Sequence, residues 1–265
     1  MSHPTAFFGA STILGKYWTK RRKFDYLVNK ENFKSTFGKS FRSIVFMDNA
    51  VANGPHASRA NVEEDTRLTD YLISHLADIR PEHTVFVTTC DMLEPEADEN
   101  TPTIKSSDDP YVQNRINMYE AVNRQYGRVL NVHLPEIASR DAAFSSLLGT
   151  LCLLEKAPEV LDFAPGEQHQ LYFPERIMGD VERCIPLGIP AIIPAAPPLT
   201  TAEIVDIIAP EIAGRLRAPQ EGDPAGCNRK SIHSFQWLDP KDGYLVSKDD
   251  QVELLRFFFR PDLAL

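Results

Sequence analysis

The feature that most constrains the fold is a regular alternation of short strand-like runs with longer segments of helical period. The runs are rich in β-branched and aromatic residues, as strands are; they cover Thr5–Phe8, Tyr26–Val28 and residues 43–47, 84–88, 128–134 and 191–193. Apolar stripes at helical spacing stand between them; they cover residues 68–79, 177–185 and 204–212, and a last helix is expected over Lys248–Phe259. This alternation predicts an α/β fold of Rossmann type, with a doubly wound, mainly parallel sheet.

The domain organisation follows from the same order of elements. We expect residues 1–157 to form a Rossmann-like dinucleotide-binding domain. Residues 158–265 would form a smaller C-terminal substrate-binding region, with segments that return to the Rossmann core. Thr200 and Glu203 have the spacing of a capping box and are expected to open the helix of the third stripe.

Composition excludes several classes of protein. The chain has 28 basic and 37 acidic residues, so its net charge of −9 argues against nucleic acid or an anionic membrane as a partner. Prolines interrupt the most hydrophobic stretch, residues 185–199, so no membrane helix is expected. The four cysteines form no Cys-x-x-Cys pair and the N-terminus shows no signal-peptide pattern, which favours the cytoplasm. The histidines have no ligand-like spacing, so no metal site is expected.

A glycine-containing turn follows the first strand and opens a helix. A Rossmann unit places such a turn where a pyrophosphate meets the helix N-terminus. Gly9 and Gly15 occupy the outer positions, but Thr12 stands where the middle glycine is usual. A side chain there hinders the approach of a phosphate unless its hydroxyl acts as a donor. The basic run from Lys16 to Lys23 is either a solvated helix face or a source of attraction for phosphates.

The end of the second strand bears on the choice of cofactor. NAD-specific sites usually place a carboxylate there, against the ribose hydroxyls. This chain has Asn29, Lys30 and Asn32 instead. A 2′-phosphate is better tolerated by these residues, so the sequence favours NADP over NAD.

A hydroxyl, a tyrosine and an arginine form the strongest chemical pattern. Thr89 follows a predicted strand, and Tyr111 and Arg115 lie one helical turn apart on one face of a predicted helix. A nearby positive charge favours phenolate, so we expect Arg115 to lower the pKa of Tyr111 from its usual value near 10. Tyr111 is then a candidate general acid or base.

The order strand, glycine turn, helix, Thr88-Thr89-Cys90-Asp91 and Tyr111-x-x-x-Arg115 resembles the extended short-chain dehydrogenase/reductases. This superfamily contains NAD(P)-dependent nucleotide-sugar epimerases, dehydratases and reductases, and the chain is most similar to a divergent branch of it. Members usually carry a helix, a strand and a helix between the second strand and the next one found here. Only residues 31–42 stand there, so one strand is expected to be missing and the second strand to lie near an edge.

The resemblance implies a role for each matching residue. Tyr111 would be the catalytic acid/base, Thr89 the hydroxyl that binds the reacting substrate oxygen, and Arg115 the counterpart of the family's lysine. Pyrophosphate would be held by residues of the turn: Gly9, Ser11, Thr12, Ile13 and Gly15. Further cofactor contacts are expected from Asn29, Lys30, Asn32, Thr88, Leu134 and Pro135. Substrate contacts are expected from Asp91, Arg140, Tyr172 and Arg176.

Three functions fit these residues to different degrees. The first is an NAD(P)-dependent enzyme that reduces, epimerises or dehydrates a nucleotide-activated sugar, acting as a possible homodimer. The second is a catalytically degenerate dinucleotide-binding protein, a sensor of NADP or a scaffold in sugar-nucleotide biosynthesis. The third is a methyltransferase-like Rossmann protein, a class that gives no reason for Tyr111 and Arg115 at this spacing.

Overall fold

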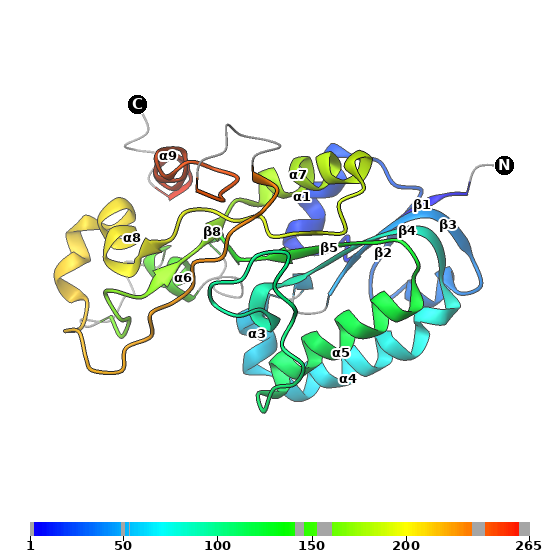
Figure 1. Ribbon diagram of the computed structural model, residues 1–265, viewed down its shortest axis with the longest axis horizontal. Helices are drawn as coiled ribbons and strands as arrows, with labels where there is room; N and C mark the ends of the chain where they lie inside the picture. The colour runs from blue at the N-terminus through cyan, green and yellow to red at the C-terminus, as the bar shows by residue number, and fades with distance from the viewer. Residues whose placement is uncertain are drawn as a thin grey trace. The chain divides into compact units, whose positions relative to one another are not determined.

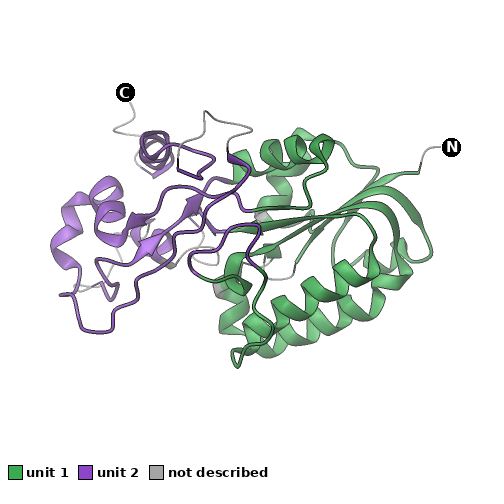
Figure 2. Cartoon of the chain, in the orientation of Figure 1, with its two compact units in different colours: residues 1–94, 102–134, 174–192 green, residues 95–101, 135–173, 193–265 purple. Residues whose placement is uncertain are grey.

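The computed structural model describes residues 3–48, 51–52, 54–140, 146–152, 161–234 and 242–259. The chain divides into two compact units, which Figure 2 shows in green and purple. Unit 1 comprises residues 1–94, 102–134 and 174–192, and unit 2 comprises residues 95–101, 135–173 and 193–265. The domain boundary expected between residues 157 and 158 lies outside the described residues.

Unit 1 is built on a six-stranded parallel sheet with the strand order β2-β1-β3-β4-β5-β9 (Figure 1). Its strands are β1 (Thr5–Phe8), β2 (Tyr26–Val28), β3 (Ser40–Met47), β4 (Arg80–Thr89), β5 (Val129–Leu134) and β9 (Ala191–Ile192). The chain moves from β1 to β2 in one direction and then returns to β3 on the other side of β1. The point where the strand order reverses therefore lies between β1 and β3.

Helices cover both faces of this sheet. Figure 1 shows α4 and α5 side by side on one face, and α1 and α7 together on the other. The helices of unit 1 are α1 (Ile13–Arg21), α3 (Pro55–Ala60), α4 (Val62–His75), α5 (Pro110–Gln125) and α7 (Pro174–Leu187), with short 3₁₀ turns η1 (Phe33–Thr36), η2 (Leu76–Asp78) and η3 (Cys90–Met92). This arrangement confirms the predicted Rossmann-type fold.

The predicted strands are all present, with small changes in their bounds. Strands β3 and β4 begin earlier than predicted, because their first residues pair with each other across the sheet: Ser40 lies opposite Arg80 and Phe41 opposite Pro81. The sequence does not predict the early start of β4, because Pro81 and the charged residues around it have a low strand propensity. β2 ends the sheet on one side, as the short stretch after it predicts.

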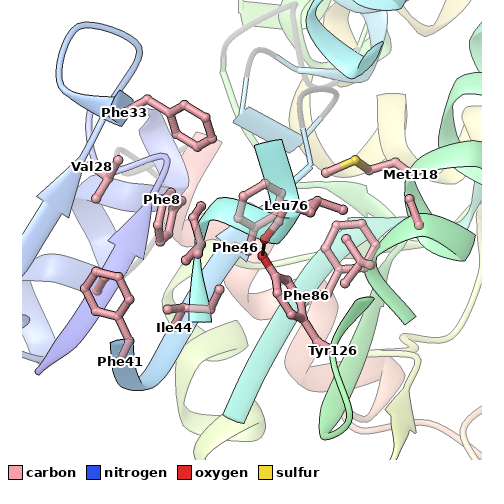
Figure 3. Packing of buried hydrophobic residues seen from close by; sticks show 14 residues of the cluster. Phe8, Val28, Phe33, Phe41, Ile44, Phe46, Leu76, Phe86, Met118 and Tyr126 are labelled. Atoms are coloured by element: carbon pink, nitrogen blue, oxygen red, sulfur yellow. Dashed lines mark hydrogen bonds between the residues drawn. The ribbon is translucent and has the colours of Figure 1, made fainter. Parts of the chain in front are cut away.

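The main core of unit 1 fills the space between the sheet and the α4–α5 layer. Aromatic side chains of the strands meet aromatic and aliphatic side chains of the helices there, as Figure 3 shows for Phe8, Phe46 and Phe86. The hydroxyl of Tyr126, where α5 ends, donates to the backbone oxygen of Leu76 at 2.9 Å, so even the polar atom of this side chain is satisfied inside the core.

Unit 2 combines short strands with three described helices. Its elements are β6 (Glu136–Ile137) paired with β8 (Leu171–Tyr172), β7 (Gln168–His169) paired with β10 (Leu199–Thr200), α6 (Ser146–Cys152), α8 (Thr201–Ile208), η5 (Pro210–Arg215) and α9 (Lys248–Phe259). The capping box of α8 is confirmed, since Thr200 and Glu203 exchange hydrogen bonds. The two-residue strands are too short to leave an alternating pattern, and the sequence did not predict them.

Among the described helices, none is both long and apolar enough to cross a bilayer.

Candidate active site

The turn after β1 is closed by hydrogen bonds of its own side chain and backbone. Thr12 is the N-cap of α1, and its hydroxyl accepts from the backbone N–H of Gly15 at 3.0 Å. The same hydroxyl donates to the backbone oxygen of Gly9 at 2.7 Å. Thr12 therefore stabilises the turn, and its hydroxyl proton is already engaged. To act as a phosphate donor, as the sequence predicts, the Thr12 hydroxyl has to give up its hydrogen bond to Gly9 and donate to the phosphate instead.

Both outer glycines are required by the backbone of the turn. Gly9 has a φ of +102°, a conformation that side chains rarely adopt. Gly15 has an ordinary φ, but a Cβ atom there would lie 2.2 Å from the backbone oxygen of Gly9. The first turn of α1 thus lies directly against the glycine turn, with room for no side chain. This close approach is the structural role that a Rossmann unit gives to its last glycine.

We expect Gly15→Ala to destabilise the protein by about 3 kcal/mol, because the added methyl must displace backbone atoms of the turn. Urea denaturation followed by circular dichroism measures this. Gly127→Ala is the matched control, since a Cβ at Gly127 meets nothing within 4 Å. Equal stability of the two variants would show that the turn is not packed as the structure has it.

A cavity of about 600 Å³ opens at the carboxyl ends of β1, β2 and β3. Its walls include Gly9 and Thr12 of the turn, Asn29 after β2 and Met47 at the end of β3. Ligands of open α/β sheets bind at this edge, at the point where the strand order reverses. The volume is in the range of small-molecule sites. The cavity is therefore the candidate cofactor site of unit 1.

The residues after β2 build the wall of this cavity on the edge-strand side. Asn29 and Asn32 bond to each other's backbone, at 2.8 Å from Asn29 N to Asn32 Oδ1 and 3.1 Å from Asn32 N to Asn29 Oδ1. Lys30 points its ammonium toward Glu64 at 3.7 Å, and Arg67 binds both oxygens of the Glu64 carboxylate. Two cations thus share one carboxylate at the cavity wall.

The basic run extends away from the glycine turn. α1 covers only residues 13–21, and four of the five cations of the run lie at or after its C-terminal end. At 1.5 Å per residue that end is about 12 Å from the turn. Lys16 alone lies in the first turns, and Arg22 pairs with Glu182 of α7 at 3.6 Å. Of the two interpretations of the run, this geometry favours a solvated helix end for most of its cations.

Tyr111 is buried beside the carboxyl end of β4. Its side chain is 1% exposed, and its hydroxyl donates to Asp91 Oδ2 at 2.8 Å. Thr89, the last residue of β4, lies within hydrogen-bond reach of the same phenol oxygen. Asp109 caps α5 by accepting from the Tyr111 backbone N–H at 2.9 Å, which fixes where this helix begins.

The environment raises the pKa of Tyr111 above its ordinary value. Burial is the largest cause, and the negative charge of Asp91 adds to it; Arg115 acts in the opposite sense but is outweighed. Arg115 thus lowers the pKa of Tyr111, as predicted, but the expectation of a pKa below the usual value is wrong, because burial and Asp91 outweigh the arginine. At neutral pH Tyr111 holds its proton and is set up to donate it.

Arg115 is itself bound by two carboxylates. Its guanidinium, fully buried, binds Asp48 at the end of β3 and Asp65 of α4, the latter at 2.7 Å. Asp48 also accepts from the Thr88 hydroxyl at 2.9 Å, and Asp65 accepts from the Asn114 amide at 2.8 Å. Arg115 therefore joins β3, α4 and α5 in a buried network behind Tyr111.

A second arginine contacts the ring of Tyr111. Arg59 of α3 stacks on the Tyr111 ring, with 4.0 Å from its guanidinium carbon to the ring centroid. The same side chain forms ion pairs with Asp91 at 3.3 Å and with Asp109 at 2.8 Å. Arg115 lies farther from the ring centroid, at 5.1 Å. Of the two arginines, Arg59 is therefore the one closer to the Tyr111 ring.

The remaining predicted residues fall into three groups. Leu134 lies opposite Thr89 at the ends of β5 and β4. Thr88 is buried, and its hydroxyl donates to Asp48. Ser11 is exposed in the turn, and the side chain of Ile13 lies outside the described residues. Pro135, Arg140 and Tyr172 belong to unit 2 and Arg176 to unit 1. Arg140 donates to the backbone oxygen of Phe258, and Tyr172 is fully buried.

The sequence reading missed several residues of this site. Asp48 and Asp65 are buried partners of Arg115, and Arg59 and Glu64 contact predicted site residues. The sequence does contain a signal for Asp48, because this residue directly follows the apolar run of β3. Ligands of parallel sheets bind at the carboxyl ends of the strands, so polar residues at these positions are site candidates. α3 and α4 give no such signal, because their charged residues look like those of any solvated helix. In the described part of the chain, no group of His, Cys, Asp or Glu is arranged to hold a metal ion.

No protein-family model and no curated protein matches this sequence. Solved structures match over nearly its whole length. A dTDP-4-dehydrorhamnose reductase from Yersinia enterocolitica is 10% identical with a TM-score of 0.68, and the match covers 97% of this chain and 100% of that one. A UDP-N-acetylglucosamine 4-epimerase from Bacillus cereus is 12% identical with a TM-score of 0.66, covering 98% and 100%.

The Bordetella bronchiseptica enzyme WbmG, solved in complex with NAD and UDP, is 9% identical with a TM-score of 0.68, and the match covers 100% of this chain and 96% of that one. These neighbours are thus a reductase and an epimerase of nucleotide-linked sugars and an enzyme that binds NAD and UDP. At such identities the likeness concerns the fold, and it confirms the Rossmann-like α/β fold that the sequence motifs predict.

Proposed function

We propose that this protein is an NAD(P)-dependent enzyme that acts on a nucleotide-activated sugar by reduction, epimerisation or dehydration, with Tyr111 as general acid/base. The observation that carries the proposal is the Tyr111–Asp91 hydrogen bond with Thr89 in reach, in the same unit as the cavity at the glycine turn. The neighbours support it, because they include a reductase, an epimerase and an enzyme that holds NAD and UDP.

The residues of unit 1 fit a dinucleotide. The cavity meets the glycine turn, where α1 approaches so closely that a Cβ at Gly15 has no room. Gly9, Ser11 and Thr12 would hold the pyrophosphate, with Asn29 and Lys30 at the adenosine end. When bound, the nicotinamide supplies the hydride donor or acceptor of the reaction.

The proton is moved by residues of β4, η3 and α5. Tyr111 holds it on its phenol oxygen at neutral pH, because burial and Asp91 raise its pKa. Thr89 orients the substrate oxygen at the end of β4. Asp91 orients the phenol by accepting its hydrogen bond, and is itself held by the ion pair with Arg59. Arg115 fixes the position of α5 through its ion pairs with Asp48 and Asp65, and is therefore a positioning residue in this scheme.

The preference for NADP is open to a direct test at Lys30. A 2′-phosphate at the edge-strand wall would meet Lys30 and Arg67, which now share Glu64. We expect Lys30→Ala to weaken NADPH about tenfold, the loss of one charge-assisted contact, and to leave NADH unchanged. Glu64→Gln, which frees both cations, should strengthen NADPH. Isothermal titration calorimetry measures both, with exposed Lys34→Ala as the control; an equal loss for NADH and NADPH would contradict this assignment.

One alternative is a dinucleotide-binding protein without turnover. It is favoured by the engaged hydroxyl of Thr12 and by the cover of Arg59 over Tyr111. NADPH deuterated at C4, incubated with a panel of UDP- and dTDP-linked sugars, separates the two. The enzyme transfers deuterium to a sugar carbon, which mass spectrometry detects. Tight binding of NADPH with no transfer to any sugar would favour the alternative.

We place the protein in the cytoplasm. The proposal rests on the four cysteines, Cys90, Cys152, Cys184 and Cys227, none of which forms a disulfide among the described residues. The homodimer expected from the resemblance stays a prediction, which sedimentation velocity tests.

A further inference from the structure

A second cavity, of about 950 Å³, lies on the face of the sheet that carries α1 and α7. Its lining comes from the first halves of β3, β4 and β5 and from the C-terminal parts of the two helices. The strands are parallel, so their first halves are remote from the carboxyl ends where the candidate cofactor cavity opens. No residue lines both cavities. The second cavity is therefore a separate site.

The floor of this cavity is apolar. Val45, Val85 and Leu130 lie opposite one another on adjacent strands, so their side chains share one face of the sheet. Phe7 lies opposite Val45 and contacts Trp18 of α1, which identifies the face as the one under α1. Met178 and Val181 of α7 add to the apolar wall. Such a floor suits the hydrocarbon part of a ligand.

Trp18 supplies a buried donor in the same wall. The residue is 1% exposed and its ring packs edge-on against Phe7, with centroids 5.5 Å apart. Its Nε1–H is buried and, among the described residues, has no hydrogen-bond partner. Buried tryptophan N–H groups usually have a partner, and a buried donor without one costs the free energy of its lost hydration. A ligand atom that accepts from Nε1 would remove this cost.

The rim of the cavity is positively charged overall. Arg22, Arg42 and Arg128 line it together with Glu82 and Glu182. Arg22 pairs with Glu182 at 3.6 Å, and Glu82 approaches His3 at 3.8 Å. Within the described part of the chain, Arg42 and Arg128 form no salt bridge. Both are exposed, Arg42 near the start of β3 and Arg128 just before β5, with β4 between the two strands. An anionic group at this end of the sheet is attracted to both.

We propose that this cavity binds an amphipathic organic anion. Its hydrocarbon part lies on Val45, Val85 and Leu130, an acceptor such as an amide oxygen bonds the Trp18 Nε1–H, and a carboxylate lies at Arg42 and Arg128. The assignment is independent of the proposed sugar-nucleotide activity, because no residue of the cofactor cavity takes part.

N-Dodecanoylglycine, used below its micellar concentration, has all three parts and is the probe. In ¹⁵N-resolved spectra of the full chain, the indole N–H signal of Trp18, assigned with Trp237→Phe, is expected to shift downfield on titration. Dodecyltrimethylammonium, with a similar chain and the opposite charge, is expected to leave it in place. An unmoved Trp18 signal at saturating probe, or equal shifts with both amphiphiles, overturns the proposal.

Calorimetry on variants tests the same contacts. The double variant Arg42→Ala/Arg128→Ala is expected to weaken the probe at least tenfold, whereas Arg124→Ala, an exposed arginine of α5, is not. Trp18→Phe keeps the ring and removes the donor, and should weaken the probe several-fold, with circular dichroism to confirm its fold. Undiminished binding to the double variant contradicts the proposal. So does displacement of the probe by NADPH, which would place it in the cofactor cavity.

Discussion

Tyr111→Phe is expected to reduce turnover by about 10²–10⁴-fold, the usual contribution of a positioned general acid or base. The substitution removes the phenol oxygen that donates to Asp91 and lies in reach of Thr89, and it leaves the ring on which Arg59 stacks. Binding of NADPH should stay within about twofold of wild type, because Tyr111 does not line the candidate cofactor cavity. The readout is deuterium transfer from NADPH to the sugar that the wild type accepts.

The matched control is Tyr119→Phe, on the same helix. Tyr119 is half-buried and its ring packs against His133, with centroids 5.6 Å apart. Turnover of this variant should remain close to wild type. Wild-type turnover of Tyr111→Phe would remove the tyrosine from the mechanism, even with dinucleotide binding intact.

Arg115→Met is expected to destabilise the protein by about 3–5 kcal/mol, the cost of breaking a buried ion pair by removal of one partner. Methionine fills much of the same space, but Asp48 and Asp65 then lose the guanidinium that both bind. Asp48 directly follows β3 and Asp65 belongs to α4, so the loss weakens the packing of α4 and α5 against the sheet. Urea denaturation followed by circular dichroism measures the change.

Two further variants make this prediction specific. Arg124→Met, at an exposed position of α5, should change stability by less than about 0.5 kcal/mol. Adding Asp65→Asn to Arg115→Met removes one of the two unpaired charges and should restore part of the lost stability. An Arg115→Met variant as stable as Arg124→Met would show that the buried network is not formed in solution.

The elements of the sheet were predictable because their signals are local. The aromatic and β-branched runs at Thr5–Phe8 and Tyr26–Val28 predicted β1 and β2 with their observed bounds, and the short stretch after β2 predicted its place at the edge. The unpredicted elements are those whose formation depends on distant residues. Thr200 pairs with Gln168 in the two-residue strands β10 and β7, which no local period reveals.

The electrostatics of the candidate site were not predictable from spacing. Tyr111 and Arg115 were expected to interact alone, and one helical turn does bring the arginine to 5.1 Å from the ring. Burial of the phenol is the largest cause of the raised pKa, and the charges that act beside it come from elsewhere in the sequence. Asp91 raises the pKa of Tyr111, and Asp48 and Asp65 neutralise Arg115. Only the folded chain brings these carboxylates together, so the sign of the shift required the structure.

The most direct test of the account is calorimetric titration of the full chain with NADPH and NADH. We expect a single dinucleotide site, weakened by Lys30→Ala for NADPH alone. Dinucleotide at 100 times its Kd should stabilise the fold by about 2.7 kcal/mol, which raises the Tm by several degrees. No heat of binding and no change in Tm at millimolar NADPH or NADH would contradict the central claim that the glycine turn and its cavity hold a dinucleotide.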